Sequence, residues 1–203
     1  ATGLIPDIIG GHGPKASPDE RCKELNQIFR LKSEGGILDR HGVVEYVNGI
    51  APGVFVTVST NNEEIAYQMQ YHSMGPGPLW TLYRPYHLCN LETPLTVAKA
   101  VIDREPTIVP IDGPVSECIT VAKKDLKAGE NIDGIGGYTT YGSIATAQDT
   151  RKNNYVLYGL VNKNAKMLKD VKKGELLTHD AVQIDTSTQL YKVRKEQDAI
   201  YYK

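Results

Sequence analysis

The sequence predicts an α+β fold, in which a portion of mixed helices and strands runs to about residue 114 and an all-β domain follows over 115–203. Three observations predict this division. Helix-capping signals and helical periodicity mark the first portion, and β-branched runs lie between its helices. After about residue 114 the pattern changes to short apolar runs separated by Lys, Asp and Gly. Within that part, the phrase KDLKAGE at 124–130 returns as KDVKKGE at 169–175.

The first predicted element is a helix in the stretch SPDERCKELNQIFRLKSEGG, between Ser17 and Gly35. Ser17 is a suitable N-cap, Pro18 suits the first helical position, and Glu20 completes a capping box. Four apolar residues recur at helical spacing and predict a buried face: Cys22, Leu25, Ile28 and Phe29.

Two strands and a second helix are predicted next. The run GVFVTVST at 53–60 is rich in β-branched residues, and LWTLYRPYHL at 79–88 predicts a strand that stops near Pro85. The segment 92–105 predicts a short helix with Thr93 as its cap and Pro94 at its first position.

The repeated phrase predicts two copies of a strand, turn and short strand. Gly129 and Gly174 stand where a tight turn needs positive φ, which glycine adopts at little cost. One hairpin cannot bury its own apolar face, so the two copies are expected to pack against each other about a pseudo-twofold axis.

Composition narrows the class of protein. The chain has 203 residues, 40% of them hydrophobic, and a formal net charge of −1, so no excess charge indicates nucleic acid or membrane as a partner. Its three cysteines lie far apart and are odd in number, which is typical of a reducing compartment and predicts a cytoplasmic location. Metal-binding spacings such as C-x-x-C and H-x-x-x-H do not occur.

Nucleotide-binding signatures are also missing from the sequence. It contains neither G-x-G-x-x-G nor a G-x-x-x-x-G-K phosphate loop, and GIGGY at 134–138 has the wrong spacing and precedes no convincing helix. We therefore expect this chain by itself to bind no NAD tightly.

The strongest candidate site lies in LYRPYHLCNLETP, where Arg84, Tyr86, His87 and Glu92 are close in sequence. Arg84 could clamp a substrate carboxylate or phosphate, and His87 could exchange a proton near neutral pH. The structural alternative is that Arg84 pairs with a carboxylate of the protein and His87 bonds a carbonyl. Both interpretations remain open.

A second candidate lies in IIGGHGPK, where His12 and Lys15 stand among glycines. Backbone amides in such a segment can meet an anion. A glycine-rich connection carrying one histidine is the simpler alternative.

The residues of 115–203 resemble a known domain. The phrases VAKKDLKAGENI and MLKDVKKGELLTHDAV are similar to the SAF domain, a β-clip fold found in sialic acid synthase, type III antifreeze protein and altronate dehydratase. More widely, ATG, HGP, GGIL, PGVF, LYRPYHLCNLETPL and DGIGGYTTYG resemble the C-terminal half of homoserine-dehydrogenase-like NAD(P)-dependent oxidoreductases, the group that includes deoxyxylulose phosphate reductoisomerase-like enzymes.

This resemblance implies an enzyme of which the chain is one part. Residues 1–114 would be the C-terminal part of a catalytic domain, with the nucleotide-binding domain outside this chain. NAD or NADP would bind the full-length protein, a homo-oligomer acting on a small hydroxy acid or sugar-like substrate, and this fragment alone would bind no cofactor and be inactive. The implied site has His87 and Arg84 as catalytic residues, and it has four substrate-binding residues: Tyr86, Glu92, His12 and Lys15.

Two other functions stay open at this point. In one, the chain is a non-catalytic SAF module that binds a carbohydrate or a protein partner. In the other, it is a lyase related to altronate dehydratase, which the oxidoreductase-like residues before the SAF-like part disfavour.

Overall fold

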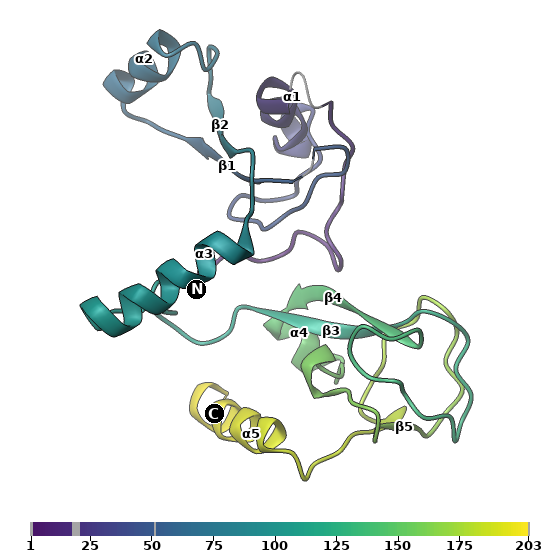
Figure 1. Ribbon diagram of the computed structural model, residues 1–203. Coiled ribbons are helices and arrows are strands. Elements are labelled where there is room, and N and C mark those ends of the chain that lie inside the picture. The colour runs from purple at the N-terminus through teal and green to yellow at the C-terminus, as the bar shows by residue number, and fades with distance from the viewer. Residues whose placement is uncertain (1, 18–20, 51, 203) are drawn as a thin grey trace. The chain divides into compact units, whose positions relative to one another are not determined.

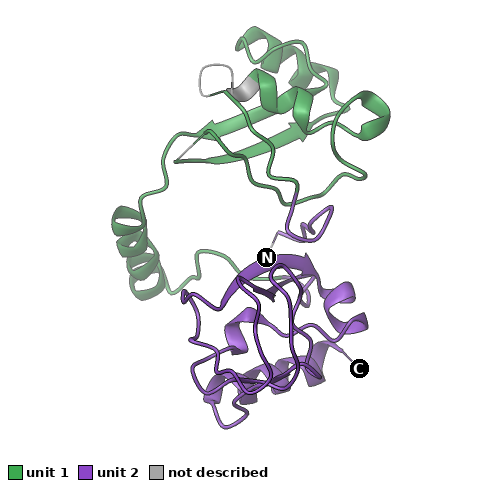
Figure 2. Ribbon diagram, turned by 90° about the vertical axis from the view of Figure 1, so that its right-hand side faces the viewer, with its two compact units in different colours: residues 1, 12–110 green, residues 2–11, 111–203 purple. Residues whose placement is uncertain are grey.

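The computed structural model describes residues 2–17, 21–50 and 52–202, and it shows mixed α/β structure with small antiparallel sheets (Figure 1). The chain forms two compact units. Unit 1 holds residues 12–110, and unit 2 holds residues 2–11 together with 111–203 (Figure 2). Among the described residues, no helix combines the length and the apolar character that a membrane crossing requires.

Unit 1 begins with helix α1, Arg21–Ile28, and a short 3-10 turn, η1, Lys32–Glu34. The predicted capping residues Pro18 and Glu20 lie outside the described residues, as does the side chain of Cys22. Leu25 and Phe29 are buried, and the Phe29 ring stacks on that of Phe55 with centroids 5.4 Å apart. The predicted apolar face of this helix is thus confirmed for these residues.

The sheet of unit 1 pairs β1, Val54–Ser59, with β2, Leu79–Arg84, in antiparallel register. Both predicted strands are confirmed. Helix α2, Glu63–Tyr71, connects them, in a segment for which the sequence analysis predicted no element. The Asn62 side chain begins this helix, because its Oδ1 accepts the N–H groups of Glu64 and Ile65 at 3.0 and 3.1 Å.

Helix α3, Cys89–Ala98, continues into a π-helical turn, η2, Lys99–Asp103. The predicted cap at Thr93 is wrong, because Pro94 lies inside the helix. Helical bonding already starts at the Leu88 carbonyl, which accepts the N–H of Leu91 at 3.0 Å and that of Glu92 at 2.9 Å. A first turn formed by these bonds places the helix start before the proline.

The described residues of unit 2 form two antiparallel pairs of strands and two helices. Strand β3, Ser116–Ala122, pairs with β4, Thr140–Thr146, and β5, Lys166–Met167, pairs with β6, Val182–Gln183. Helix α4, Ala147–Lys152, and the 3-10 turn η3, Tyr158–Leu160, lie between them, and α5, Gln189–Tyr201, ends the unit. An all-β domain is therefore not confirmed over 115–203.

The two helices of unit 2 have caps that the sequence reasoning missed. The Thr146 side chain accepts the N–H of Asp149 at 3.0 Å, and the Thr188 side chain accepts that of Tyr191 at 3.2 Å. Each threonine satisfies a backbone donor that a helix start leaves without an intrahelical partner.

The repeated phrases meet as predicted. Leu126 and Val171 form a reciprocal bridge, with N–H to carbonyl distances of 2.8 and 3.0 Å. The Asp125 carboxylate accepts the N–H of Lys173 at 2.9 Å, and the Asp170 carboxylate accepts that of Ala128 at the same distance. Gly129 and Gly174 both have φ of 86°, which confirms the predicted left-handed turns.

A buried core lies beneath this pairing, and hydrogen bonds join the segment 2–11 to unit 2. Core residues from both copies include Leu126, Val171 and Leu177. The Gly10 N–H donates to the Ile144 carbonyl at 2.8 Å, and the Ser116 hydroxyl donates to the Leu4 carbonyl at 2.9 Å.

Candidate functional site

Unit 1 has an open cavity of about 520 Å³ beside its sheet. Its lining is mostly apolar and comes from α1, from the segment before β1, and from the two strands and the residues that follow them. Glu45 and His87 also line it, together with the rings of Tyr46 and Tyr83. A concave, mostly apolar site of this size with a few polar groups suits a small molecule. The residues that line it are Leu25, Val44, Glu45, Tyr46, Val47, Ile50, Pro52, Gly53, Val54, Phe55, Tyr83 and His87.

Glu45 is the charged group held most firmly at this cavity. Its side chain is only 3% exposed. Its two oxygens accept the N–H of His12 at 3.0 and 2.9 Å, and the His12 Nε2 lies 4.0 Å from its Oε1. A backbone donor therefore orients a carboxylate that water scarcely reaches, which is the setting in which such a group acts strongly on a bound molecule.

The glycine-rich segment around His12 does meet an anion, but the anion is the carboxylate of Glu45. Lys15 does not join this group. It is exposed, and it pairs through its main chain with Asn48 in a parallel bridge. The substrate-binding roles predicted for His12 and Lys15 remain predictions, and only His12 contacts a residue that lines the cavity.

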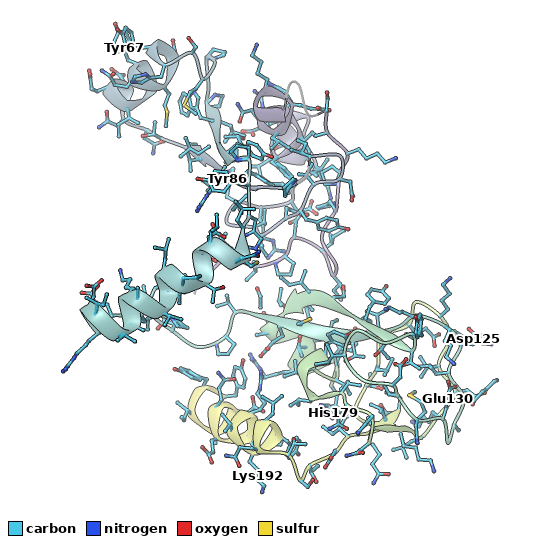
Figure 3. All side chains as sticks on the ribbon, viewed as in Figure 1. Tyr67, Tyr86, Asp125, Glu130, His179 and Lys192 are labelled. Carbon is cyan, nitrogen blue, oxygen red and sulfur yellow. The ribbon has the colours of Figure 1, made fainter. Side chains whose placement is uncertain are left out.

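Glu92 joins the residues predicted from LYRPYHLCNLETP. One of its oxygens lies 2.7 Å from the Arg84 Nη2, and the other lies 3.1 Å from the His87 Nδ1. The Arg84 guanidinium carbon also stands 4.4 Å above the centroid of the Tyr86 ring. The end of β2 and the first turn of α3 thus bring all four predicted residues together (Figure 3 labels Tyr86).

Of these four residues, only His87 lines the cavity. Its side chain is 60% exposed, and its Nε2 lies 3.7 Å from the Cys89 Sγ. Arg84 makes the contact that the structural interpretation predicts, because it pairs with a carboxylate of the protein, that of Glu92. That carboxylate also holds His87, so the pairing favours a role for Arg84 in orienting the histidine over direct substrate binding.

The glycine-rich turn near residue 134 does not fit a dinucleotide. The Asp133 carboxylate fills it, accepting the N–H of Tyr138 at 2.5 Å and that of Thr139 at 3.2 Å. The Thr139 hydroxyl, followed by the Tyr138 amide, lowers the pKa of Asp133. Amides already bound to an internal carboxylate are not available to a pyrophosphate, and the described sheets are two-stranded and antiparallel rather than the parallel strands of a nucleotide-binding fold.

The described part of the chain offers no set of side chains for a metal ion. No group of three or more His, Cys, Asp or Glu side chains lies close enough there to hold an ion.

Residues 1–93 match the family model of the oxidoreductase DRL catalytic domain. A search of the curated proteins found no match for the chain. This DRL-like region includes the whole lining of the cavity and the group formed by Arg84, Tyr86, His87 and Glu92, so the candidate site lies within the residues that are similar to an oxidoreductase catalytic domain.

Glu45 is the site residue that sequence reasoning missed. It stands in GVVEYV, one carboxylate among apolar residues, with no motif around it. The only available signal was a single charged residue in an apolar run. Such a residue indicates a buried carboxylate, and a buried carboxylate usually has a specific partner. The partner is the His12 amide, far away in the sequence.

Proposed function

We propose that this chain supplies the substrate-binding side of an NAD(P)-dependent oxidoreductase that acts on a small hydroxy acid or a sugar-like substrate. The nicotinamide cofactor would be held by residues of the full-length protein other than those described here. The observation that carries the proposal is the position of His87, which lines the cavity of the DRL-like region while Glu92 holds its ring.

His87 would exchange the proton of the substrate hydroxyl. In the tautomer that donates its Nδ1–H to Glu92, the Nε2 is an acceptor. Converting an alcohol to a carbonyl requires a group that takes the hydroxyl proton, and imidazole does this near neutral pH. Arg84 binds the other oxygen of Glu92 and so fixes the carboxylate that orients the ring.

Glu45 would bind the substrate deeper in the cavity. The His12 amide fixes its carboxylate, which can accept hydrogen bonds from substrate hydroxyl groups. A sugar-like or hydroxylated substrate offers several such donors. This requirement favours a polyol or hydroxy acid over an apolar substrate.

The test is steady-state kinetics of the full-length protein with NAD(H) or NADP(H), using homoserine and 1-deoxyxylulose 5-phosphate as the hydroxy-acid and sugar-like probes. His87→Gln is expected to lower kcat by about 100-fold, because general acid–base groups contribute factors of that order. Glu45→Gln is expected mainly to raise KM, by about tenfold, because one charge-assisted hydrogen bond is lost.

His72→Gln is the matched control. His72 belongs to unit 1, is exposed, and contacts the Tyr71 ring rather than the cavity. Wild-type kinetics in His87→Gln, or an equal loss in His72→Gln, would refute the role of His87. No turnover of either probe with either nucleotide by the wild-type protein would refute the proposed function itself.

A further inference from the structure

Unit 2 contains a second pocket, of about 290 Å³, that the proposed oxidoreductase site does not use. Helix α4 and the residues after it form one side of the pocket, and α5 forms the other side. His179, which lies between β5 and β6, also lines it. Leu157, Leu160 and the rings of three tyrosines supply its apolar surface. The tyrosines are Tyr155, Tyr191 and Tyr202.

An ion pair between α5 and β3 holds the pocket in shape. Two guanidinium nitrogens of Arg194 donate to the oxygens of Glu117 at 3.0 and 2.6 Å, and its Nε donates to Asp198 at 2.7 Å. Arg194 and Glu117 have side chains only 15% and 11% exposed. Burial alone lowers the pKa of Arg194, but the hydrogen bonds and charges of Glu117 and Asp198 outweigh it and raise that pKa.

Two other cations line the pocket without a carboxylate partner among the described residues. The Arg151 guanidinium carbon lies 3.8 Å from the centroid of the Tyr202 ring, and the Lys195 Nζ lies 5.6 Å from that of Tyr191. Asp198, the carboxylate in the lining, already accepts from Arg194. Both cations therefore keep their hydrogen-bond donors available at the pocket while aromatic rings support their positions.

His179 adds an imidazole whose pKa depends on the neighbouring groups of the pocket. Partial desolvation by the surrounding protein, and then the positive charge of Lys195, lower the pKa of His179, while Asp198 acts in the opposite direction. Arg151, Arg194 and the three tyrosines complete the titratable groups of the lining. A neutral imidazole beside unpaired cations can donate a hydrogen bond to an anion, and the anion would then favour its protonated form.

We propose that this pocket binds a small organic anion, with a carboxylate or phosphate group held by Arg151 and Lys195 and a planar or apolar body lying among the tyrosine rings and Leu157. The volume admits one small molecule, and Arg recognises both kinds of anionic group through its planar donors. The site is independent of the cavity in unit 1, because all of its lining belongs to unit 2.

The experiment is an NMR titration of the whole chain, observing the ring signals of His179 (Figure 3). Phenyl phosphate and benzoate are the anionic probes, and benzyl alcohol is the neutral probe of similar shape. We expect saturable shifts with an anionic probe, an upward shift in the pH midpoint of His179 when it is bound, and no saturable shift with benzyl alcohol. Binding of phenyl phosphate alone would assign the anionic group as phosphate, whereas binding of benzoate would show that a carboxylate suffices.

Three variants locate the binding. Arg151→Gln and Lys195→Gln are each expected to raise the dissociation constant of the anionic probe about tenfold, because each substitution removes one hydrogen bond from a charged group. Lys192→Gln is the matched control, since Lys192 lies on the same helix, is exposed, and does not line the pocket (Figure 3). Lys195 is also exposed, so its variant decides the question if Arg151→Gln unfolds.

The proposal is overturned if neither anion shifts the His179 signals saturably, if benzyl alcohol binds as tightly as the anions, or if Lys195→Gln binds like Lys192→Gln. Each of these results is independent of the oxidoreductase assay, because none involves a residue of unit 1.

Discussion

The two units differ in how they use their apolar residues. Unit 2 buries the larger core, and the reciprocal pairing of its repeated phrases closes that core from both sides. Unit 1 has a smaller core around Leu25 and Phe29, keeps a cavity of about 520 Å³ beside it, and leaves many apolar side chains exposed. In α3, for example, Leu95 is 70% exposed. Unit 2 therefore places more of its apolar residues in a buried core, whereas unit 1 leaves a larger cavity beside a smaller core.

The largest expected difference between the units is in their response to truncated leucines. Leu126 is 1% exposed and lies at the junction of the two repeats, so Leu126→Ala should lower the unfolding free energy of unit 2 by about 3 kcal/mol. Amide hydrogen exchange at Gly129 and Gly174 is the measurement, because their N–H groups bond to Met167 and Ala122 across this pairing at 2.8 Å each.

Leu95→Ala, in the exposed face of α3, is the matched control and should change stability by less than about 0.5 kcal/mol. Equal destabilisation by the two substitutions would remove the contrast between the units.

A smaller effect is expected from the turns of the repeat. Gly174 has φ of 86° with open space where a side chain would stand, so Gly174→Ala has only the backbone cost of a left-handed conformation, about 1 kcal/mol. Gly159→Ala serves as its control, since that site also has open space but no positive φ. Urea unfolding of both variants measures the difference, and equal midpoints would show that the turn carries no strain.

The smallest and most distributed effect is acid sensitivity in unit 2. The N–H of Lys173 and the ammonium of Lys172 lower the pKa of Asp125, and Lys127 with the N–H of Ala128 lowers that of Asp170. A hydrogen bond from Lys169 lowers the pKa of Asp180 to about 2. Each carboxylate has a lower pKa folded than unfolded, so it contributes stability above its unfolded pKa, and this contribution is lost as pH falls toward the folded value.

Thermal unfolding between about pH 5 and pH 2 should therefore show a falling midpoint for unit 2. The double variant Asp125→Asn, Asp170→Asn should flatten this slope, because it removes two of the responsible titrations. An unchanged slope in that variant would assign the acid sensitivity elsewhere.

Local patterns explain which elements could be predicted. Strands β1 and β2 followed from β-branched composition and the stop at Pro85, and the turns at Gly129 and Gly174 followed from the need for positive φ. Helices α2, α4 and α5 were missed although Asn62, Thr146 and Thr188 are good caps. For α4 and α5 the reason was the prediction of an all-β domain over 115–203. The start of α3 was misplaced because Pro94 suits a first helical turn more often than a position inside a helix.

The candidate sites also contain some residues that local sequence patterns could group and others that they could not. Arg84, Tyr86, His87 and Glu92 could be grouped from the sequence because only eight positions separate the first from the last. Glu45 could not, because its partner is the amide of His12, and backbone partners leave no trace in residue identity. The pocket around His179 was also missed, because its cations come from α4 and α5, which the sequence did not predict.

By itself, then, the amino-acid sequence determined the positions of the two strands of unit 1, the two glycine turns and the meeting of the repeats, since each depends on local conformational preference and on burying apolar faces. Only the tertiary structure decided that Glu45 is enclosed beside the cavity, that Glu92 joins Arg84 to His87, and that Arg151 and Lys195 share one pocket. The physical reason is that burial, hydrogen-bond partners and the pairing of charges depend on distances between residues remote along the chain.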